Sequence, residues 1–289
     1  MNILVTGSNG QLGSEIKDIA LNYKEFNFLF KDLPELNICK EDALNTFILN
    51  QNIDVVINCA AYTAVDNAEE NAEIAEQVNS LGVQNLINAL EKVNGKLVHI
   101  SSDYVFDGTS SEPYKESDFV NPLGVYGKTK RDGELFVINS NIDSIVIRTS
   151  WLYSSFGNNF VKTMYKLGNE KNSLNVISDQ IGTPTYARDL AKVCLDIISI
   201  LDSEKLSNKG KVYHYSNEGV ASWYDFACSV MELSGSKCKV KAIQTIDYSN
   251  RAKRPHYSVL NKTKIKNDFN VDIPYWKESL IDCINKLKQ

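Results

Sequence analysis

The feature that most constrains the fold is a series of short apolar runs in the first half of the chain. They are Ile3–Val5, Phe26–Phe30, Val55–Ile57, Leu97–Ile100 and Ile145–Ile147. The runs are rich in Val, Ile and Leu and do not alternate with polar residues, which is typical of strands buried on both faces. Stretches with helical spacing separate them, so the sequence predicts an α/β fold with a doubly wound parallel sheet. A set of buried helix segments is the weaker alternative, because the runs are short and rich in β-branched residues.

The alternation of strands and helices weakens after about residue 151, which indicates a second unit. We expect residues 1–150 to form the sheet domain, which also receives residues 176–200 and 212–216. Residues 151–289 are then mainly a smaller, discontinuous C-terminal α/β domain.

Composition excludes several classes of protein. Lys and Arg number 31 and Asp and Glu number 36, which gives a net charge of −5 and argues against a nucleic-acid partner. No apolar run approaches the ~18 residues of a membrane span, and the first residues lack the basic and apolar regions of a signal peptide. The six cysteines form no C-x-x-C pair and there are three histidines, so we expect a reduced, cytoplasmic protein without a metal site.

A glycine-rich turn follows the first predicted strand and opens a helix. Gly7, Gly10 and Gly13 are spaced G-x-x-G-x-x-G and enclose Gln11 and Leu12. Glycine permits a tight turn and close approach of a ligand, and the helix N-terminus offers N–H groups to a diphosphate. The turn therefore predicts dinucleotide binding, with a plain strand-to-helix turn as the alternative.

An acidic residue is expected about 20 residues further on, where it would hold the adenosine ribose. Asp32 fits this position and favours NAD, because a carboxylate repels a 2′-phosphate. Lys31 beside it offsets part of that repulsion, so NADP stays open. A loop-capping aspartate is the alternative interpretation of Asp32.

A second group of residues indicates proton transfer. Tyr126 and Lys130 are four residues apart and share a helix face. A neighbouring ammonium favours the phenolate, so we expect Lys130 to lower the pKa of Tyr126, which then protonates a carbonyl oxygen as hydride arrives at carbon. Ser102, with Ser101 as the alternative, follows the fourth predicted strand and can donate to the same oxygen. Asp103 next to it can bond a sugar hydroxyl or orient the loop.

Together these segments resemble the extended short-chain dehydrogenases/reductases, and most closely the dTDP-4-dehydrorhamnose reductase family. Further stretches carry the likeness, which runs from residue 1 to about residue 285: residues 58–66, 121–130, 148–153, 179–185 and 254–260. The resemblance implies a Rossmann-type dinucleotide-binding domain followed by a sugar-nucleotide-binding domain. It also implies reduction of the C4 ketone of dTDP-4-dehydro-L-rhamnose to dTDP-L-rhamnose with NADPH or NADH.

The resemblance also implies roles for individual residues. Ser102, Tyr126 and Lys130 would be catalytic, and Tyr126 and Lys130 would also contact the cofactor. The dinucleotide would be lined by Gly7, Gly10, Gln11, Leu12, Gly13, Asp32, Ala61, Tyr62 and Thr63. The substrate would meet Ser102, Asp103, Trp151, Asn159 and Arg254, with Asn158 and Phe160 adding to the last subsite. Trp151 as a plain core aromatic is the alternative for that position.

The sequence departs from the family pattern in places. Residue 102 is Ser where Thr is common, and Asn37 stands where an aspartate is common. Some members form a metal-bridged dimer through glutamates; Glu15 is present, but Arg188 occupies a position where that dimer needs a carboxylate. We therefore expect no structural magnesium, and a monomer and a homodimer both stay open. The competing functions are a nucleotide-sugar epimerase or dehydratase and a non-catalytic NADP-binding regulatory subunit.

Overall fold

A six-stranded, fully parallel sheet forms the larger of two units in the computed structural model, which describes residues 1–203, 210–248 and 252–289. The strand order is β2-β1-β3-β4-β5-β10. The bounds are β1 Asn2–Thr6, β2 Asn27–Lys31, β3 Val55–Asn58, β4 Lys96–Ser102, β5 Ser144–Thr149 and β10 Lys211–His214. The predicted α/β fold with a doubly wound Rossmann-type sheet is confirmed.

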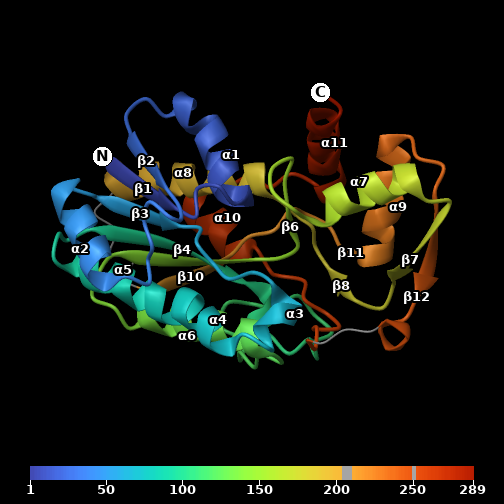
Figure 1. The fold of residues 1–289 in the computed structure, drawn as a ribbon, viewed down its shortest axis with the longest axis horizontal. Coiled ribbons are helices and arrows are strands. Elements are labelled where there is room, and N and C mark those ends of the chain that lie inside the picture. Colours follow the sequence, from blue (N-terminus) through green and yellow to red (C-terminus); the bar gives the residue numbers. More distant parts are fainter. Residues whose placement is uncertain (204–209, 249–251) are drawn as a thin grey trace.

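Helices cover both faces of this sheet (Figure 1). Helices α1 (Gln11–Ile19) and α8 (Ala187–Ser203) lie on one face, where Ile16 and Leu190 join a buried cluster with strand residues such as Ile3. Helices α2 (Glu41–Asn50), α5 (Gly82–Glu91) and α6 (Val125–Ile138) lie on the other face, over a second apolar cluster. Each strand is therefore buried on both sides, which explains why the strands read as continuous apolar runs.

Short elements complete this side of the molecule. They are α3 (Val65–Ala68), α4 (Ala72–Glu76), the π-helical turn η2 (Gln77–Leu81), the 3₁₀ turns η1 (Ala20–Asn22) and η3 (Asp103–Val105), and α10 (Thr263–Phe269). α10 places Ile265 and Phe269 in the same buried cluster as α1 and α8.

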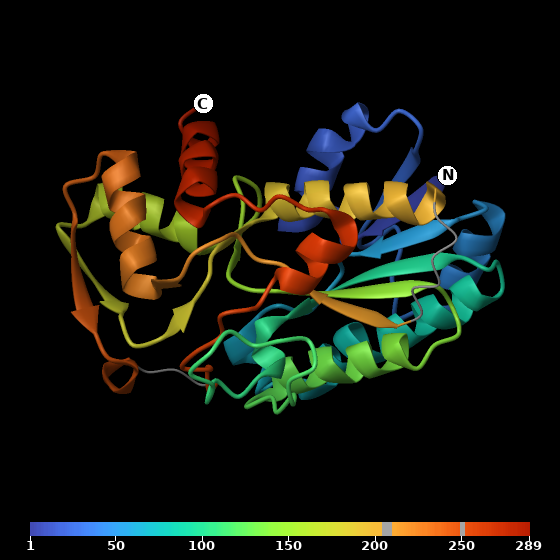
Figure 2. The same ribbon diagram turned by 180° about the vertical axis from the view of Figure 1, so that it is seen from behind.

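The smaller unit is built around a parallel pair of strands, β7 (Ser173–Ile177) and β12 (Lys239–Ile243). Helices α7 (Phe160–Glu170), α9 (Trp223–Ser234) and α11 (Trp276–Leu287) pack with this pair around an aromatic-rich core. Two further pairs, β6 (Leu152–Tyr153) with β9 (Thr185–Tyr186) and β8 (Ile181–Gly182) with β11 (Ala221–Ser222), lie between the units, and η4 (Thr245–Asp247) follows β12. Figure 2 shows the two units side by side from behind.

The chain passes between the units more than once. β10 pairs with β5 in the large sheet, and α8 packs there against α1. β7, in contrast, pairs with β12, so residues 176 and 177 of the expected 176–200 insertion lie in the smaller unit.

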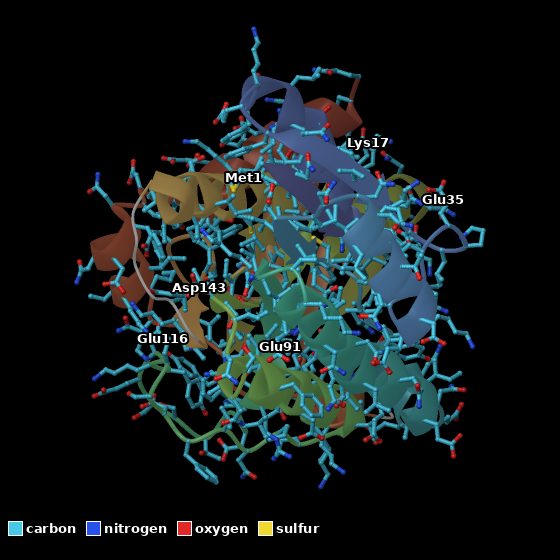
Figure 3. The ribbon with its side chains drawn as sticks, turned by 90° about the vertical axis from the view of Figure 1, so that its left-hand side faces the viewer. Met1, Lys17, Glu35, Glu91, Glu116 and Asp143 are labelled. Atoms are coloured by element: carbon cyan, nitrogen blue, oxygen red, sulfur yellow. The ribbon has the colours of Figure 1, made fainter. Side chains whose placement is uncertain are left out.

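The carboxyl edge of the large sheet faces the smaller unit. Met1 and Asp143 directly precede β1 and β5, and both lie at the opposite, amino edge, the end of the sheet seen in Figure 3. The strand order reverses between β1 and β3, and in open α/β sheets ligands bind at the carboxyl side of such a point. A ligand site is therefore expected at this edge, next to the loops that follow β1 and β3.

Candidate active site

The turn after β1 requires glycine at two positions. Gly7 has φ +62, and a Cβ on it would lie 2.6 Å from the backbone nitrogen of Ala60. A Cβ on Gly13 would lie 2.5 Å from the carbonyl oxygen of Gly7. The turn is therefore packed against the loop after β3, and it has the strand–turn–helix arrangement that the sequence predicts.

Helix α1 begins at this turn with an open N-terminus. Its N-cap is Gly10, no side chain caps it, and its first turn carries no acidic residue. The free N–H groups and the positive end of the helix dipole suit an anionic group. Leu12 is buried in the core, so only its backbone can serve the predicted contact. Gln11 donates from Nε2 to Leu152 O at 3.4 Å, while its buried Oε1 has no hydrogen-bond partner among the described residues.

Asp32 follows β2 and reaches back to the glycine turn. Its Oδ2 accepts from the backbone N–H of Asn9 at 2.8 Å, and its Oδ1 accepts from the N–H of Leu33 at 2.8 Å. The carboxylate thus caps the loop and also lies beside the turn, so both interpretations of Asp32 fit the geometry. Lys31 pairs with Glu35 at 2.8 Å, which offsets part of the charge that it could offer to a 2′-phosphate.

The loop Ala61–Thr63 after β3 is held by a buried amide that the sequence analysis missed. Asn79 Oδ1 accepts from the N–H of Tyr62 at 2.8 Å, and its Nδ2 donates to Tyr62 O at 3.1 Å. The same Nδ2 donates to Thr129 Oγ1 of α6 at 3.2 Å. Asn79 lies in the π-helical turn η2, and such turns within helices are frequent at functional sites.

Ser102 and Asp103 lie at the carboxyl end of β4 and are buried. Ser102 Oγ donates to Asp103 Oδ1 at 3.1 Å and accepts from the N–H of Tyr104 at 3.2 Å. Burial raises the pKa of Asp103 to about 6, while the nearby Ser258 and Ser102 hydroxyls act to lower it. Its Oδ2 is buried without a hydrogen-bond partner among the described residues, so one carboxylate oxygen can accept a bond from a ligand. The Oγ of Ser101, the alternative to Ser102, is likewise buried without a partner in the described part of the chain.

Tyr126 and Lys130 both lie on α6, as the spacing predicts. Burial raises the pKa of Tyr126 to about 12; the nearby Ser102 hydroxyl acts to lower it, and the charge of Asp103 raises it further. The hydroxyls of Ser102 and Tyr126 are therefore neighbours. The Tyr126 ring also meets the edge of Tyr104, with ring centroids 5.5 Å apart.

The expectation that Lys130 lowers the pKa of Tyr126 is wrong. Lys130 Nζ donates instead to the carbonyl oxygen of Ile100 in β4 at 2.6 Å. Burial lowers the pKa of Lys130 to about 8, with Glu134 opposing that shift. The desolvation of the phenol outweighs any effect of the ammonium, so Tyr126 is protonated at neutral pH.

Trp151 and Asn159, the next two predicted substrate residues, lie in different surroundings. Trp151 has φ +46, follows β5 and stacks on Trp223 at 3.7 Å between ring centroids. Asn159 caps α7: its Oδ1 accepts from the N–H of Lys162 at 3.0 Å, and its Nδ2 donates to Ser154 O at 2.7 Å. This amide is used within the loop, which favours a supporting role for Asn159 over direct substrate contact.

Arg254 forms a bidentate ion pair with Asp66 of α3, at 2.6 and 3.1 Å. This pair joins the loop before residue 260 to α3, the first helix after β3. Burial acts to lower the pKa of Arg254, but Asp66 and Tyr104 raise it overall. No pattern in the sequence marks Asp66 and Tyr104 as partners of Arg254.

Arg188 forms ion pairs with two acidic side chains. Its Nη1 contacts Glu15 Oε2 at 3.2 Å and also pairs with Asp18. Glu15 is fully buried and accepts from Ser154 Oγ at 2.6 Å. Within the described ranges, no group of three His, Cys, Asp or Glu side chains is arranged to hold a metal ion.

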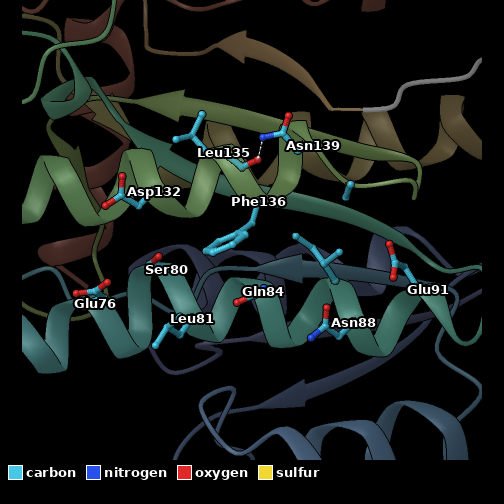
Figure 4. A pocket seen from close by; sticks show the side chains of 12 residues that line it. Glu76, Ser80, Leu81, Gln84, Asn88, Glu91, Asp132, Leu135, Phe136 and Asn139 are labelled. Atoms are coloured by element: carbon cyan, nitrogen blue, oxygen red, sulfur yellow. Dashed lines mark hydrogen bonds between the residues drawn. The ribbon is translucent and has the colours of Figure 1, made fainter.

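A groove of about 640 Å³ lies elsewhere, between α5 and α6 (Figure 4). Glu76, Gln84, Asp132 and Phe136 are among its lining residues. Among the described side chains, those of Ser102, Tyr126 and Lys130 do not line it. The catalytic candidates therefore lie outside this groove.

Comparison with known proteins identifies the family. The model of the RmlD substrate binding domain matches residues 1–289. A dTDP-4-dehydrorhamnose reductase from Aggregatibacter actinomycetemcomitans is 40% identical over 285 residues, which cover 96% of each chain. A crystal structure of such a reductase from Clostridium acetobutylicum has a TM-score of 0.93 and 43% identity and covers 100% of both chains. Another, from Bacillus anthracis in complex with NADP, has a TM-score of 0.92 and 35% identity and covers 99% of both chains. The chain therefore belongs to the RmlD substrate-binding family, the family of the dTDP-4-dehydrorhamnose reductases.

Proposed function

We propose that the protein is an NAD(P)H-dependent oxidoreductase that reduces the C4 ketone of dTDP-4-dehydro-L-rhamnose to give dTDP-L-rhamnose. The observation that carries this proposal is the convergence of Ser102, at the carboxyl end of β4, with Tyr126 and Lys130 of α6, whose Nζ donates to Ile100 O of the same strand. Two neutral hydroxyls beside a dinucleotide turn are what a carbonyl reduction needs. Family membership and the relative crystallised with NADP support the same activity.

The residues present fit a dinucleotide. Gly7 and Gly13 leave space that a Cβ would fill, and α1 presents its open N-terminus there. The groups that would hold the cofactor are this turn, Asp32, the loop Ala61–Thr63 and Lys130. When bound, the nicotinamide supplies the hydride that reduces the carbonyl carbon.

Tyr126 supplies the proton. The phenol is protonated at neutral pH and carries the proton that the ketone oxygen takes up, so that hydride plus proton convert the ketone to an alcohol. Ser102 bonds the same oxygen and orients it. The fixed donation of Lys130 to Ile100 O holds the ammonium at the strand that ends in Ser102.

Asp103 and Arg254 suit the rest of the substrate. The partnerless Oδ2 of Asp103 is placed to accept from a sugar hydroxyl. Arg254 has the forked geometry that binds phosphate oxygens, and Asp66 holds it in position until a diphosphate competes for it.

We also propose which part of the chain performs each task. The large sheet with α8 and β10 binds the dinucleotide, and the smaller unit closes the sugar-nucleotide site over its carboxyl edge. No helix in the described part of the chain is both long and apolar enough to cross a membrane. We propose a cytoplasmic location, a dTDP-linked 4-keto-6-deoxysugar as the small-molecule partner, and a monomer or homodimer as the assembly.

The structure favours this reaction over the related ones. A dehydratase typically has Asp-Glu after the serine position, whereas here Asp103 is followed by Tyr104, whose pKa is raised by burial. An epimerase returns the hydride and retains its NAD. A non-catalytic NADP-binding subunit has no need for Ser102, Tyr126 and Lys130 together.

A spectrophotometric assay tests the proposal. NADPH and NADH oxidation should follow addition of dTDP-4-dehydro-L-rhamnose, and the product should be dTDP-L-rhamnose. Purified protein that retains NAD and turns over without net oxidation would indicate an epimerase or dehydratase instead. Binding of NADPH without any turnover would support the regulatory subunit.

The pH profile of the reaction should show the titration of the Lys130 ammonium. We expect kcat/KM for ketone reduction to be full below about pH 8 and to fall about tenfold within one unit above the pKa of Lys130, because the ammonium then loses its charge. Tyr126, with its pKa near 12, does not titrate in this range. Lys128→Met, an exposed position on the same helix, is the control and should keep the profile. If kcat/KM of the Lys130→Met variant still falls above about pH 8, the fall belongs to another group.

Asp32 should set the cofactor preference. Asp32→Ala is expected to raise the KM for NADH about 10- to 100-fold, the range for losing hydrogen bonds to a charged group, and to change the KM for NADPH less. Asp32→Asn serves as the matched variant, because it keeps an acceptor for the Asn9 N–H and removes the charge. The ratio of kcat/KM values for the two cofactors is the measurement, and an unaltered ratio in both variants would remove Asp32 from the ribose site.

A further inference from the structure

Two tryptophans from different parts of the chain form a parallel stack beside the sheet edge. The rings of Trp151 and Trp223 are 3.7 Å apart between centroids, with planes within 9° of each other. Both side chains are partly exposed. Trp151 was singled out by sequence, whereas Trp223 begins α9 and belongs to the smaller unit. The stack therefore bridges the two units.

Strand register brings Trp151 to the edge of the sheet at which Ser102 lies. Thr149 at the end of β5 pairs with Ser102 at the end of β4, and Trp151 follows two residues later. Its φ of +46 is uncommon for a residue with a bulky side chain. Such strain persists where the surroundings fix the conformation, and it clusters at functional sites.

The surroundings that fix Trp151 come from one pair of strands. β8 pairs with β11 so that Gly182 lies opposite Ala221, two residues before Trp223. A Cβ on Gly182 would lie 2.7 to 2.8 Å from Cε2, Cζ2 and Nε1 of Trp151, so the indole occupies the space that any side chain there would need. Gly182 lies within residues 179–185, whose sequence is Asp-Gln-Ile-Gly-Thr-Pro-Thr. This stretch has no role in the site described above.

The start of α9 is also fixed in direction. Ser222 caps the helix: its Oγ accepts from the N–H of Asp225 at 3.0 Å, and Asp225 Oδ2 accepts from the N–H of Ser222 at 2.9 Å. This capping box holds the first helical residue, Trp223, in one orientation relative to β11. Phe160 supports it from the other helix, with ring centroids 4.7 Å apart.

We propose that Trp223 and Gly182 are positioning residues that hold the Trp151 indole as the apolar wall of the sugar subsite, and that Trp223 thereby sets the affinity for the 6-deoxysugar. The proposal rests on the function proposed above. Gly182 admits the ring, Trp223 stacks on it, and β8 and β11 keep the two at a constant spacing. The nucleotide and dinucleotide sites do not depend on this stack.

Kinetics of Trp223 variants test the proposal. Trp223→Ala should raise the KM for dTDP-4-dehydro-L-rhamnose about tenfold, the scale of an aromatic pair, with kcat and the KM for NADPH within a few-fold of wild type. The inhibition constant of dTDP alone should stay the same. Trp223→Phe keeps a stacking ring and should restore most of the affinity, and Gly182→Ala should reproduce the Trp223→Ala defect by displacing the indole.

Trp276→Phe is the matched control. Trp276 is buried in the same aromatic core, and its Nε1 has no hydrogen-bond partner among the described residues. This variant should leave the KM for the sugar nucleotide unchanged. An equal rise in KM from Trp276→Phe, or a KM unaffected by both Trp223→Ala and Gly182→Ala, would overturn the proposal.

Calorimetry separates this inference from the proposed function. The dissociation constant of the product dTDP-L-rhamnose needs no turnover, and it should rise about tenfold in Trp223→Ala if the stack forms the sugar subsite. An unchanged constant would overturn the inference and leave the reductase function standing. Wild-type protein that binds dTDP-L-rhamnose but does not reduce the ketone would overturn the function instead.

Discussion

Replacement of Tyr126 by Phe is expected to lower kcat by about 10²- to 10⁴-fold, the usual contribution of a positioned proton donor. The ring and its contact with Tyr104 stay in place, so the loss reflects the hydroxyl alone. NADPH affinity should remain within a few-fold of wild type, because the dinucleotide turn is untouched. Steady-state kinetics and NADPH titration of the same preparation measure both quantities.

Tyr165→Phe gives the matched control for this substitution. Tyr165 lies on α7 in the smaller unit, so removal of its hydroxyl should leave kcat unchanged. A Tyr126→Phe variant with wild-type kcat would refute the assignment of the proton donor and direct attention to Ser102.

Arg148→Met is expected to destabilise the fold by about 3–5 kcal/mol, the cost of leaving one partner of a buried ion pair alone. Arg148 of β5 contacts Glu134 of α6 through Nε at 2.9 Å and Nη2 at 2.7 Å, with 4% and 1% of the two side chains exposed. The guanidinium also lies 5.1 Å from the Phe106 ring centroid. Urea unfolding of wild type and variant measures the difference in free energy of unfolding.

An exposed pair on another helix calibrates that result. Lys166 and Glu170 of α7 are 3.9 Å apart with 73% and 52% of their side chains exposed, so Lys166→Met should change stability by less than about 1 kcal/mol. The double variant Arg148→Met/Glu134→Leu removes both buried charges and should recover part of the loss. A single Arg148→Met variant as stable as wild type would show that Glu134 finds another partner.

The strands and the glycine turn were predictable because both leave local patterns. A strand buried on both faces must be apolar throughout, and each of the five predicted runs overlaps a strand of the large sheet. Gly7 and Gly13 are fixed by close backbone approach, which excludes every other side chain. The spacing of Tyr126 and Lys130 placed both on one helix for the same local reason.

The interactions that complete the site join residues far apart in the chain, and no local pattern marks them. Asp66 meets Arg254, and Trp223 meets Trp151, across long separations in the sequence. The raised pKa of Tyr126 leaves no mark in the sequence for a related reason: the spacing reveals Lys130 one turn away but not the desolvation that raises the pKa. Burial is a property of the whole fold.

The single amide of Asn79 has a wider consequence. It forms hydrogen bonds with the backbone of Tyr62, in the loop after β3, and with Thr129 on the helix that carries Tyr126 and Lys130. Under the function proposed above, the loop that would hold the cofactor and the helix that would carry proton transfer therefore share one support. A substitution of Asn79 is therefore expected to affect both, and a change of nucleotide preference made through this loop is expected to alter turnover as well.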